Sequence, residues 1–184
     1  MRIIGGNFRG RALKSPTSNV IRPTSDRLRE SIFNILVHAY GDPVTDARVL
    51  DLFAGTGALG LEAMSRGARF ALFVEKAFEA HRLIRDNIET LSLTGTTRIF
   101  RRDATKLGAM GAMEPFDLVF CDPAYGKGFA EKALKAAYEG KWLTPSALVV
   151  VEEAAKPGFM TPKGFDELER REYGDTELII ARAV

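Results

Sequence analysis

Short apolar runs alternate with longer amphipathic stretches along most of the chain. The apolar runs predict five strands, at residues 48–53, 70–75, 97–103, 116–122 and 147–153. The amphipathic stretches between them predict helices at residues 59–66, 77–91, 104–110 and 128–138. Strands that are apolar along nearly their whole length and are separated by helices indicate a parallel sheet covered on both faces. The pattern therefore predicts a doubly wound α/β fold.

The end of the chain departs from this alternation. Residues 167–173 and 176–183 have the character of strands, and Gly174-Asp175 between them predicts a tight turn. Two strands joined in this way form an antiparallel hairpin, which we place at an edge of the sheet. A strand–helix alternation that ends in such a hairpin favours the class I methyltransferase (Rossmann-like) variant of the fold over the dehydrogenase variant.

The start of the chain predicts a small hairpin followed by a helix. Ile3-Ile4 and Ala12-Leu13 flank the glycine-rich segment GGNFRG, and Pro23-Thr24-Ser25 offers Thr24 or Ser25 as the helix N-cap. The apolar positions of this helix fall on one face: Leu28, Ile32, Ile35, Leu36 and Ala39. A second, polar face carries Arg27, Glu30 and Asn34, which are either solvated or border an active site. We divide the chain into a basic extension, residues 1–40, and a catalytic domain, residues 41–184.

Charge is distributed unevenly along the chain. The formal net charge is +2, but residues 1–40 carry seven basic side chains against Asp26 and Glu30. A basic end suggests contact with a polyanion, although a solvated segment explains it as well. One cysteine excludes an intrachain disulfide and fits a reducing compartment. The apolar runs are too short to span a bilayer. We expect a cytoplasmic monomer with no membrane partner.

The segment DLFAGTGALGLEA, residues 51–63, contains the pattern G-x-G-x-x-G at Gly55, Gly57 and Gly60. Such a turn after a strand is a weak indication of a nucleotide ligand. Asp51 precedes the turn, where its carboxylate would repel a pyrophosphate but suit the ammonium group of S-adenosylmethionine. Glu75 ends the second predicted strand and can accept hydrogen bonds from ribose hydroxyls, which both kinds of ligand carry.

Asp103-Ala104 ends the third predicted strand and allows two interpretations. The Asp103 carboxylate could accept from the N6 amine of an adenine while the Ala104 backbone N–H donates to the ring. Asp103 could equally be a helix N-cap. With Phe53 at the end of the first strand, the predicted cofactor-binding residues are Asp51, Phe53, Gly55, Gly57, Glu75, Asp103 and Ala104.

The fourth predicted strand ends in Asp122-Pro123-Ala124-Tyr125. This resembles the [Asp/Asn/Ser]-Pro-Pro-[Tyr/Phe] motif of methyltransferases that modify exocyclic amines of bases. The lone pair of such an amine is delocalised into the ring, so the amine is a poor nucleophile. A carboxylate and the Pro123 carbonyl can accept its two N–H groups and favour a pyramidal nitrogen, while Tyr125 stacks on the flipped base. The predicted catalytic residues are Asp122, Pro123 and Tyr125.

Taken together, these motifs resemble the RsmD-type 16S ribosomal RNA guanine-N2 methyltransferases over essentially the whole chain. The most specific part is Arg22-Pro23-Thr24 with Arg27, Arg29-Glu30 and Phe33-Asn34. The resemblance implies methylation of a guanine N2 in 16S rRNA, within the assembled 30S subunit, with S-adenosylmethionine as cofactor. Ala124 departs from the family, which often carries a second proline there. The residues expected to bind substrate are Arg9, Arg11, Lys14, Arg22, Thr24, Arg27, Arg29 and Asn34.

Several alternatives stay open. Asp-Pro-x-Tyr also serves adenine-N6 methyltransferases, and a small NAD(P)-binding protein or a non-catalytic RNA assembly factor would belong to a different class. His38 and His81 lack partners at ligand spacing, so we expect no metal site. We interpret Cys121 as a structural thiol and Trp142 as a core residue. The loop at residues 156–165 is either a plain connector or a substrate contact.

Overall fold

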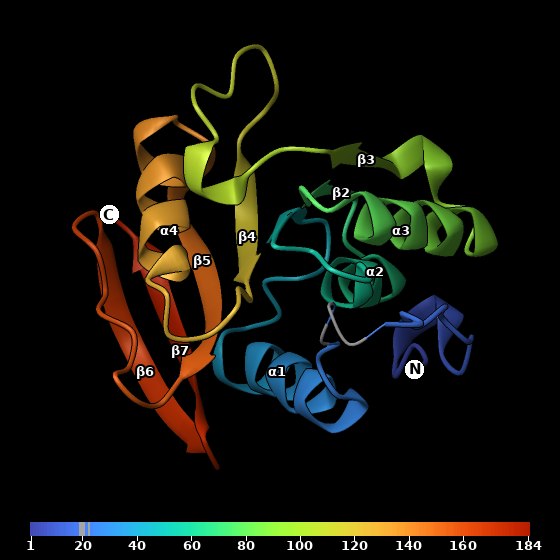
Figure 1. Cartoon of the computed structure of the whole chain (residues 1–184), viewed down its shortest axis with the longest axis horizontal. Helices are drawn as coiled ribbons and strands as arrows, with labels where there is room; N and C mark the ends of the chain where they lie inside the picture. The colour runs from blue at the N-terminus through green and yellow to red at the C-terminus, as the bar shows by residue number, and fades with distance from the viewer. Residues whose placement is uncertain (19–20, 22) are drawn as a thin grey trace.

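The computed structural model of the 184-residue chain describes residues 1–18, 21 and 23–184. Its centre is a seven-stranded sheet in the order β3-β2-β1-β4-β5-β7-β6 (Figure 1). The strands are β1 (Arg48–Leu52), β2 (Phe70–Val74), β3 (Thr97–Phe100), β4 (Phe116–Cys121), β5 (Leu143–Ala154), β6 (Phe165–Tyr173) and β7 (Thr176–Ala183).

The five strands from β1 to β5 are parallel, and the last two are antiparallel. β1 lies between β2 and β4, and β5 follows β4 in parallel register. β7 then pairs antiparallel with both β5 and β6, so the terminal hairpin closes one edge of the sheet. The predicted doubly wound fold with a C-terminal hairpin is confirmed. Because the carboxyl ends of parallel strands share one edge, the loops after β1, β2, β3 and β4 meet there.

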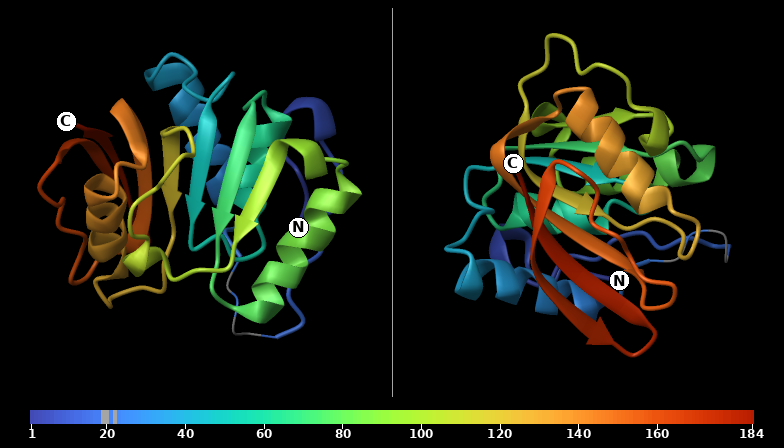
Figure 2. Two further views of the ribbon diagram at one scale, coloured as in Figure 1. Left: turned by 90° about the horizontal axis from the view of Figure 1, so that it is seen from above. Right: turned by 90° about the vertical axis from the view of Figure 1, so that its left-hand side faces the viewer.

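Helices cover both faces of the sheet because the strands are apolar on both. One face packs against α1 (Asp26–Ala39), α2 (Ala58–Ser65) and α3 (Phe78–Thr90), and the other against α4 (Phe129–Glu139). In the right-hand view of Figure 2, α4 and α1 lie on opposite sides of the sheet. Trp142 is fully buried in the α4 layer, as expected for a core residue. Within the described residues, no helix combines the length and apolar character that crossing a membrane would require.

The prediction of a helix at residues 104–110 is wrong. Only one turn of 3-10 helix, η3 (Ala104–Lys106), forms there. Gly108 and Gly111 both have positive φ, which an α-helix cannot accommodate. The Gly108 carbonyl instead accepts a hydrogen bond from the Trp142 indole at 2.8 Å. This contact ties the irregular segment to the core. The third strand is also shorter than predicted, ending at Phe100.

The N-terminal segment forms the expected hairpin, but with a single bridge between Arg2 and Ala12. A short 3-10 turn, η1 (Gly6–Phe8), connects its two arms. Ile3 and Leu13 join the same hydrophobic cluster as α1, α2 and the central strands. Residues 1–40 therefore contribute to the core of the whole chain.

The helix α1 begins where the sequence predicted. Ser25 is its N-cap, and its hydroxyl accepts from Leu28 N at 3.1 Å. Of the predicted apolar face, Ile32, Ile35 and Leu36 are buried, whereas Ala39 is exposed at the end of the helix. The buried side also includes Arg29 and Phe33, which the apolar pattern did not contain.

Candidate active site

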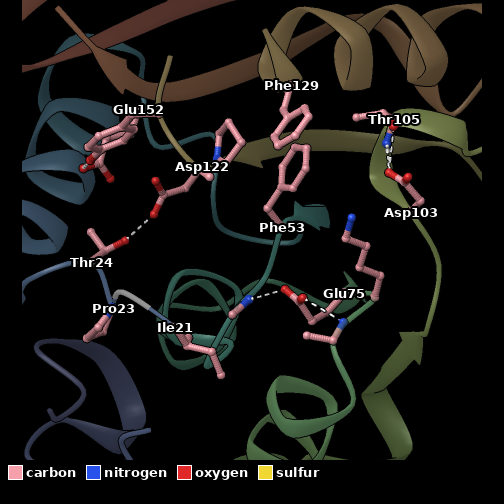
Figure 3. A pocket seen from close by; sticks show the side chains of 16 residues that line it. Ile21, Pro23, Thr24, Phe53, Glu75, Asp103, Thr105, Asp122, Phe129 and Glu152 are labelled. Atoms are coloured by element: carbon pink, nitrogen blue, oxygen red, sulfur yellow. Dashed lines mark hydrogen bonds between the residues drawn. The ribbon is translucent and has the colours of Figure 1, made fainter. Parts of the chain in front are cut away.

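A cavity of about 580 Å³ opens at the carboxyl ends of the parallel strands. Its walls come from the loops after β1, β2, β3 and β4, from the start of α4 and from the segment before α1 (Figure 3). Ligands of open α/β sheets bind at this edge, where the strand order reverses. Here the reversal falls between β1 and β4, because the chain order runs outward from β1 to β3 and then returns to β4.

The glycine turn forms the floor beside β1. Phe53 and Gly55 line the cavity, both with positive φ, at 57° and 59°. Gly57 instead caps α2 at φ 81° and packs against Phe73 and Ile84. It is not among the residues that line the cavity, and its predicted contact with a cofactor stays a prediction.

Asp51 lies beneath the turn and is 1% exposed. Its Oδ2 accepts from Gly60 N at 3.0 Å, and burial raises the pKa of its carboxyl well above the usual value. It borders a small hollow next to the main cavity, shared with Thr24 and Asp122. Asp51 therefore adjoins the site from below and holds the start of α2 in place.

Glu75 and Asp103 line the other half of the cavity, in the loops that follow β2 and β3. Glu75 accepts from Gly55 N at 2.9 Å and from Ala77 N at 3.1 Å. Asp103 Oδ1 accepts from the backbone N and the hydroxyl of Thr105, and the hydroxyl contact is the main cause of its lowered pKa. Asp103 is thus an N-cap, as one of its two interpretations predicted, and it also faces the cavity.

The predicted contact of the Ala104 backbone N–H with an adenine ring stays a prediction. Ala104 is 4% exposed and belongs to the hydrophobic cluster under α4. Thr105 lines the cavity.

Asp122, at the end of β4, is where two distant parts of the chain meet. Its Oδ2 accepts from the Thr24 hydroxyl at 2.7 Å. Burial and then the neighbouring charge of Glu152 raise the pKa of Asp122 well above its usual value, and the Thr24 hydrogen bond opposes them. Pro123, Ala124 and Tyr125 line the cavity beside it. Cys121, the preceding residue, is buried on the opposite face, which confirms its interpretation as a structural thiol.

Two features of the site were missed by the sequence analysis. Glu152, on β5, lines the cavity, and its carboxylate accepts a hydrogen bond from the Tyr125 hydroxyl. The sequence did contain a signal for Glu152, because it is an acid near the end of an otherwise apolar strand. The second feature is a stack of Phe53 on Phe129, with ring centroids 6.4 Å apart. Both rings line the cavity, and Figure 3 shows them side by side.

The residues expected to bind substrate do not gather in one place. Thr24 lines the cavity, whereas Arg27 and Asn34 are exposed on α1. Arg9 is exposed beside η1, and Arg22 lies outside the described residues.

Arg11 and Lys14 lie against α3, away from the cavity wall. The Arg11 guanidinium donates to the Thr90 carbonyl at 2.8 Å, and the Lys14 ammonium pairs with Asp86 at 3.1 Å. Both side chains belong to exposed residues. They are accessible to a partner that approaches along this side of the molecule.

Arg29 is fully buried, which contradicts its expected contact with substrate. Its guanidinium pairs with Glu62 at 3.2 Å and with Asp26 at 2.9 Å. It also donates to the backbone carbonyls of Thr24 and Arg2. Arg29 therefore connects the hairpin, α1 and α2, and it holds Thr24 beside Asp122.

Comparison with known proteins gives a consistent result. The family model described as Conserved hypothetical protein 95 matches residues 1–182. The protein named Ribosomal RNA small subunit methyltransferase D of Escherichia coli (strain K12) is 38% identical over 161 residues, covering 88% of this chain and 78% of that protein. The protein of the same name from Haemophilus influenzae is 33% identical over 176 residues, covering 95% and 89%.

A solved structure extends the likeness to three dimensions. The protein described as "Putative methyltransferase yhhF from Escherichia coli" superposes with a TM-score of 0.83 at 33% identity, covering 100% of this chain and 97% of that one. The match spans the hairpin, the sheet and the site at its carboxyl edge. The chain therefore belongs to the RsmD-type family of ribosomal RNA small subunit methyltransferases.

Proposed function

We propose that this protein transfers a methyl group from S-adenosylmethionine to the exocyclic N2 of a guanine in 16S rRNA, within the assembled 30S subunit. The observation that carries the proposal is the position of Asp122. Its carboxylate lies just after β4 in the same cavity as Glu75 and Asp103, which follow β2 and β3 in the chain. One cavity thus presents acceptors for a nucleoside cofactor at one end and for an amine at the other.

The residues in the cavity fit the cofactor. Each Glu75 oxygen accepts one backbone N–H and keeps a second lone pair that can accept a ribose hydroxyl. The hydrogen bonds found to Asp103 among the described residues go to Oδ1, so Oδ2 can accept from an adenine amine. Phe53, next to the stacked ring of Phe129, offers an apolar surface to an aromatic base. When bound, S-adenosylmethionine supplies an electrophilic methyl group on its sulfonium and leaves as the neutral thioether.

The chain's own residues orient the target amine. The carboxylate of Asp122 and the carbonyl of Pro123 accept its two N–H groups, which directs the nitrogen lone pair toward the methyl group. Positive charge develops on the nitrogen in the transition state, and a carboxylate beside it stabilises that charge. Because the pKa of Asp122 is raised, this carboxylate is also a better proton acceptor for the amine than an ordinary aspartate.

The relatives support the RNA substrate. Two of them, at 38% and 33% identity, are named for methylation of small-subunit ribosomal RNA. The basic side chains of residues 1–40, with Arg9, Arg11 and Lys14 exposed, provide contacts for phosphates around the target.

The test is tritium transfer from labelled S-adenosylmethionine to 30S particles and to naked 16S rRNA, both prepared from cells in which the gene is disrupted. We expect transfer to 30S, with N2-methylguanosine identified by mass spectrometry of the nucleosides. N6-methyladenosine as the product would assign the alternative reaction. Absence of transfer, together with no calorimetric binding of S-adenosylhomocysteine, would refute the proposal.

A further inference from the structure

Glu152 occupies an unusual position for a carboxylate. It lies on β5, paired with β4 on one side and β7 on the other, and it is only 8% exposed. One oxygen accepts from the Tyr125 hydroxyl. The other, Oε2, is buried, and within the described parts of the chain no N–H or hydroxyl group reaches it, so its only partner there is a proton shared with Asp122. A buried acceptor without a donor is costly, so such an atom at the wall of a cavity indicates a donor on the ligand.

The carboxyl groups of Glu152 and Asp122 lie side by side in the cavity (Figure 3). They can hydrogen-bond to each other only by sharing a proton, since neither has an N–H group. Thr24 donates to Asp122 from one side, and Tyr125 donates to Glu152 from the other. Asp51 is a third acid near Asp122, with which it lines the small hollow. The cluster therefore has more acceptors than donors, and a ligand with two adjacent donors would complement it.

Guanine carries two such donors on one edge. Its N2 amine lies next to the ring atom N1, which bears a hydrogen. In adenine the ring atom next to the amine is an acceptor, because N1 there carries a lone pair. A carboxylate facing this ring atom would thus attract guanine and repel adenine.

We propose that Glu152 accepts the N1–H of the target guanine while Asp122 accepts from its N2 amine, so that Glu152 selects guanine over adenine. This inference rests on the proposed function. It assigns to β5 a specificity-determining residue outside the Asp-Pro-Ala-Tyr segment. The Tyr125 hydroxyl orients the Glu152 carboxylate, and the same tyrosine ring borders the base. Recognition of the base edge and its placement for methyl transfer are thereby linked through one side chain.

The test uses Glu152→Gln in the full-length protein, with Glu177→Gln as the matched control. The glutamine Oε1 can still accept from Tyr125, but its amide places a donor where N1–H needs an acceptor. Glu177 is also a buried acid, 4% exposed, on the neighbouring strand β7, and it pairs with Arg170 away from the cavity. We would measure methyl transfer to undermethylated 30S, affinity for S-adenosylhomocysteine, the melting temperature and the ratio of methylated guanine to methylated adenine in naked rRNA.

For Glu152→Gln we expect the rate on 30S to fall about 10- to 100-fold. Affinity for S-adenosylhomocysteine should stay within about twofold, and the guanine-to-adenine product ratio should fall. The substitution replaces the carboxylate beside Asp122 by a neutral amide and leaves Asp51 as the neighbouring acid, so the pKa of Asp122 should fall. The acid limb of the rate should therefore move to lower pH. Glu177→Gln should match the wild type in all activity measurements.

An unchanged rate and product ratio in Glu152→Gln would overturn the inference. A lower rate would also overturn it if the melting temperature and the affinity for S-adenosylhomocysteine fell as well, since Glu152 would then be structural. These outcomes require an active wild-type enzyme. If the wild type itself methylates neither base, the proposed function fails, and the two failures are distinguished.

Discussion

The Thr24 hydroxyl donates a hydrogen bond to Asp122 Oδ2 at 2.7 Å, across 98 positions of the chain. This bond joins the segment before α1 to the end of β4, at the centre of the candidate site. The buried guanidinium of Arg29 donates a hydrogen bond to the backbone carbonyl of Thr24. The N-terminal segment therefore shapes the site directly, in addition to any contact that it makes with RNA.

Removing this hydroxyl should change the pH dependence of the reaction. The hydrogen bond from Thr24 lowers the pKa of Asp122, so Thr24→Val should raise it further above its usual value. Asp122 must be ionised to accept from the amine, and the acid limb of kcat/KM should therefore move to higher pH. Thr24→Ser, which keeps the hydroxyl, should retain the wild-type profile. An unmoved acid limb in Thr24→Val would mean that the limb reports another group.

Asp122→Ala should abolish turnover while leaving affinity for S-adenosylmethionine within a few-fold. The carboxylate acts on the amine in the transition state, so its loss appears in the rate. Removing one oriented electrostatic partner costs about 10²–10³ in rate. Asp122→Asn keeps an acceptor oxygen but not the charge, and it should lose less. Single-turnover kinetics with calorimetry would check both variants, and a near-normal rate in Asp122→Ala would assign catalysis elsewhere.

Glu75→Ala should have the opposite effect. Each hydrogen bond from a ribose hydroxyl to this carboxylate contributes about 1.5–3 kcal/mol, so losing one or both should lower cofactor affinity about tenfold or more. The rate at saturating cofactor should change much less. Glu89→Ala, which removes an exposed acid of α3 that does not line the cavity, is the matched control. Calorimetry measures the affinities, and equal binding by wild type and Glu75→Ala would show that β2 does not end at a ribose.

Arg29→Met should destabilise the fold rather than weaken RNA binding directly. Glu62 is also fully buried, and the substitution would remove one of its two ion-pair partners, leaving Arg66. Breaking a buried ion pair costs about 3–5 kcal/mol, and the lower end is expected here because Arg66 stays in place. Arg27→Met, exposed on the same helix, should change the free energy of unfolding by less than about 0.5 kcal/mol. Urea denaturation would compare them, and equal midpoints would refute the structural role of Arg29.

Replacing Arg9, Arg11 and Lys14 together by alanine should weaken binding to 30S and flatten its salt dependence. Each lost phosphate contact should reduce the log–log slope by about 0.7–0.9. Affinity for free S-adenosylmethionine should not change, because these residues do not line the cavity. A control triple of exposed lysines on or beside α4, Lys132, Lys135 and Lys141, should keep the wild-type slope. If the first triple also keeps it, the basic segment is only solvated.

Local pattern was sufficient for most of the architecture. Buried parallel strands must be apolar along their length, so β1, β2 and β4 were visible as runs, and Gly174 marked the terminal turn. Acids at the ends of strands, such as Asp122, could also be recognised from the sequence, because they interrupt these apolar runs. The single predicted helix that did not form began at Ala104, where glycine conformation and the Trp142 contact outweighed amphipathic periodicity.

The sequence by itself thus determined the order of strands and helices and the acids that end at one edge of the sheet. Only the tertiary structure decided that Arg29 is buried, that Thr24 reaches Asp122, and that Glu152 lies beside it. The physical reason is the separation along the chain of the residues that interact. Periodicity and strand-end polarity are set by neighbouring residues, whereas the partner of a buried charge is set by packing between segments far apart in the chain.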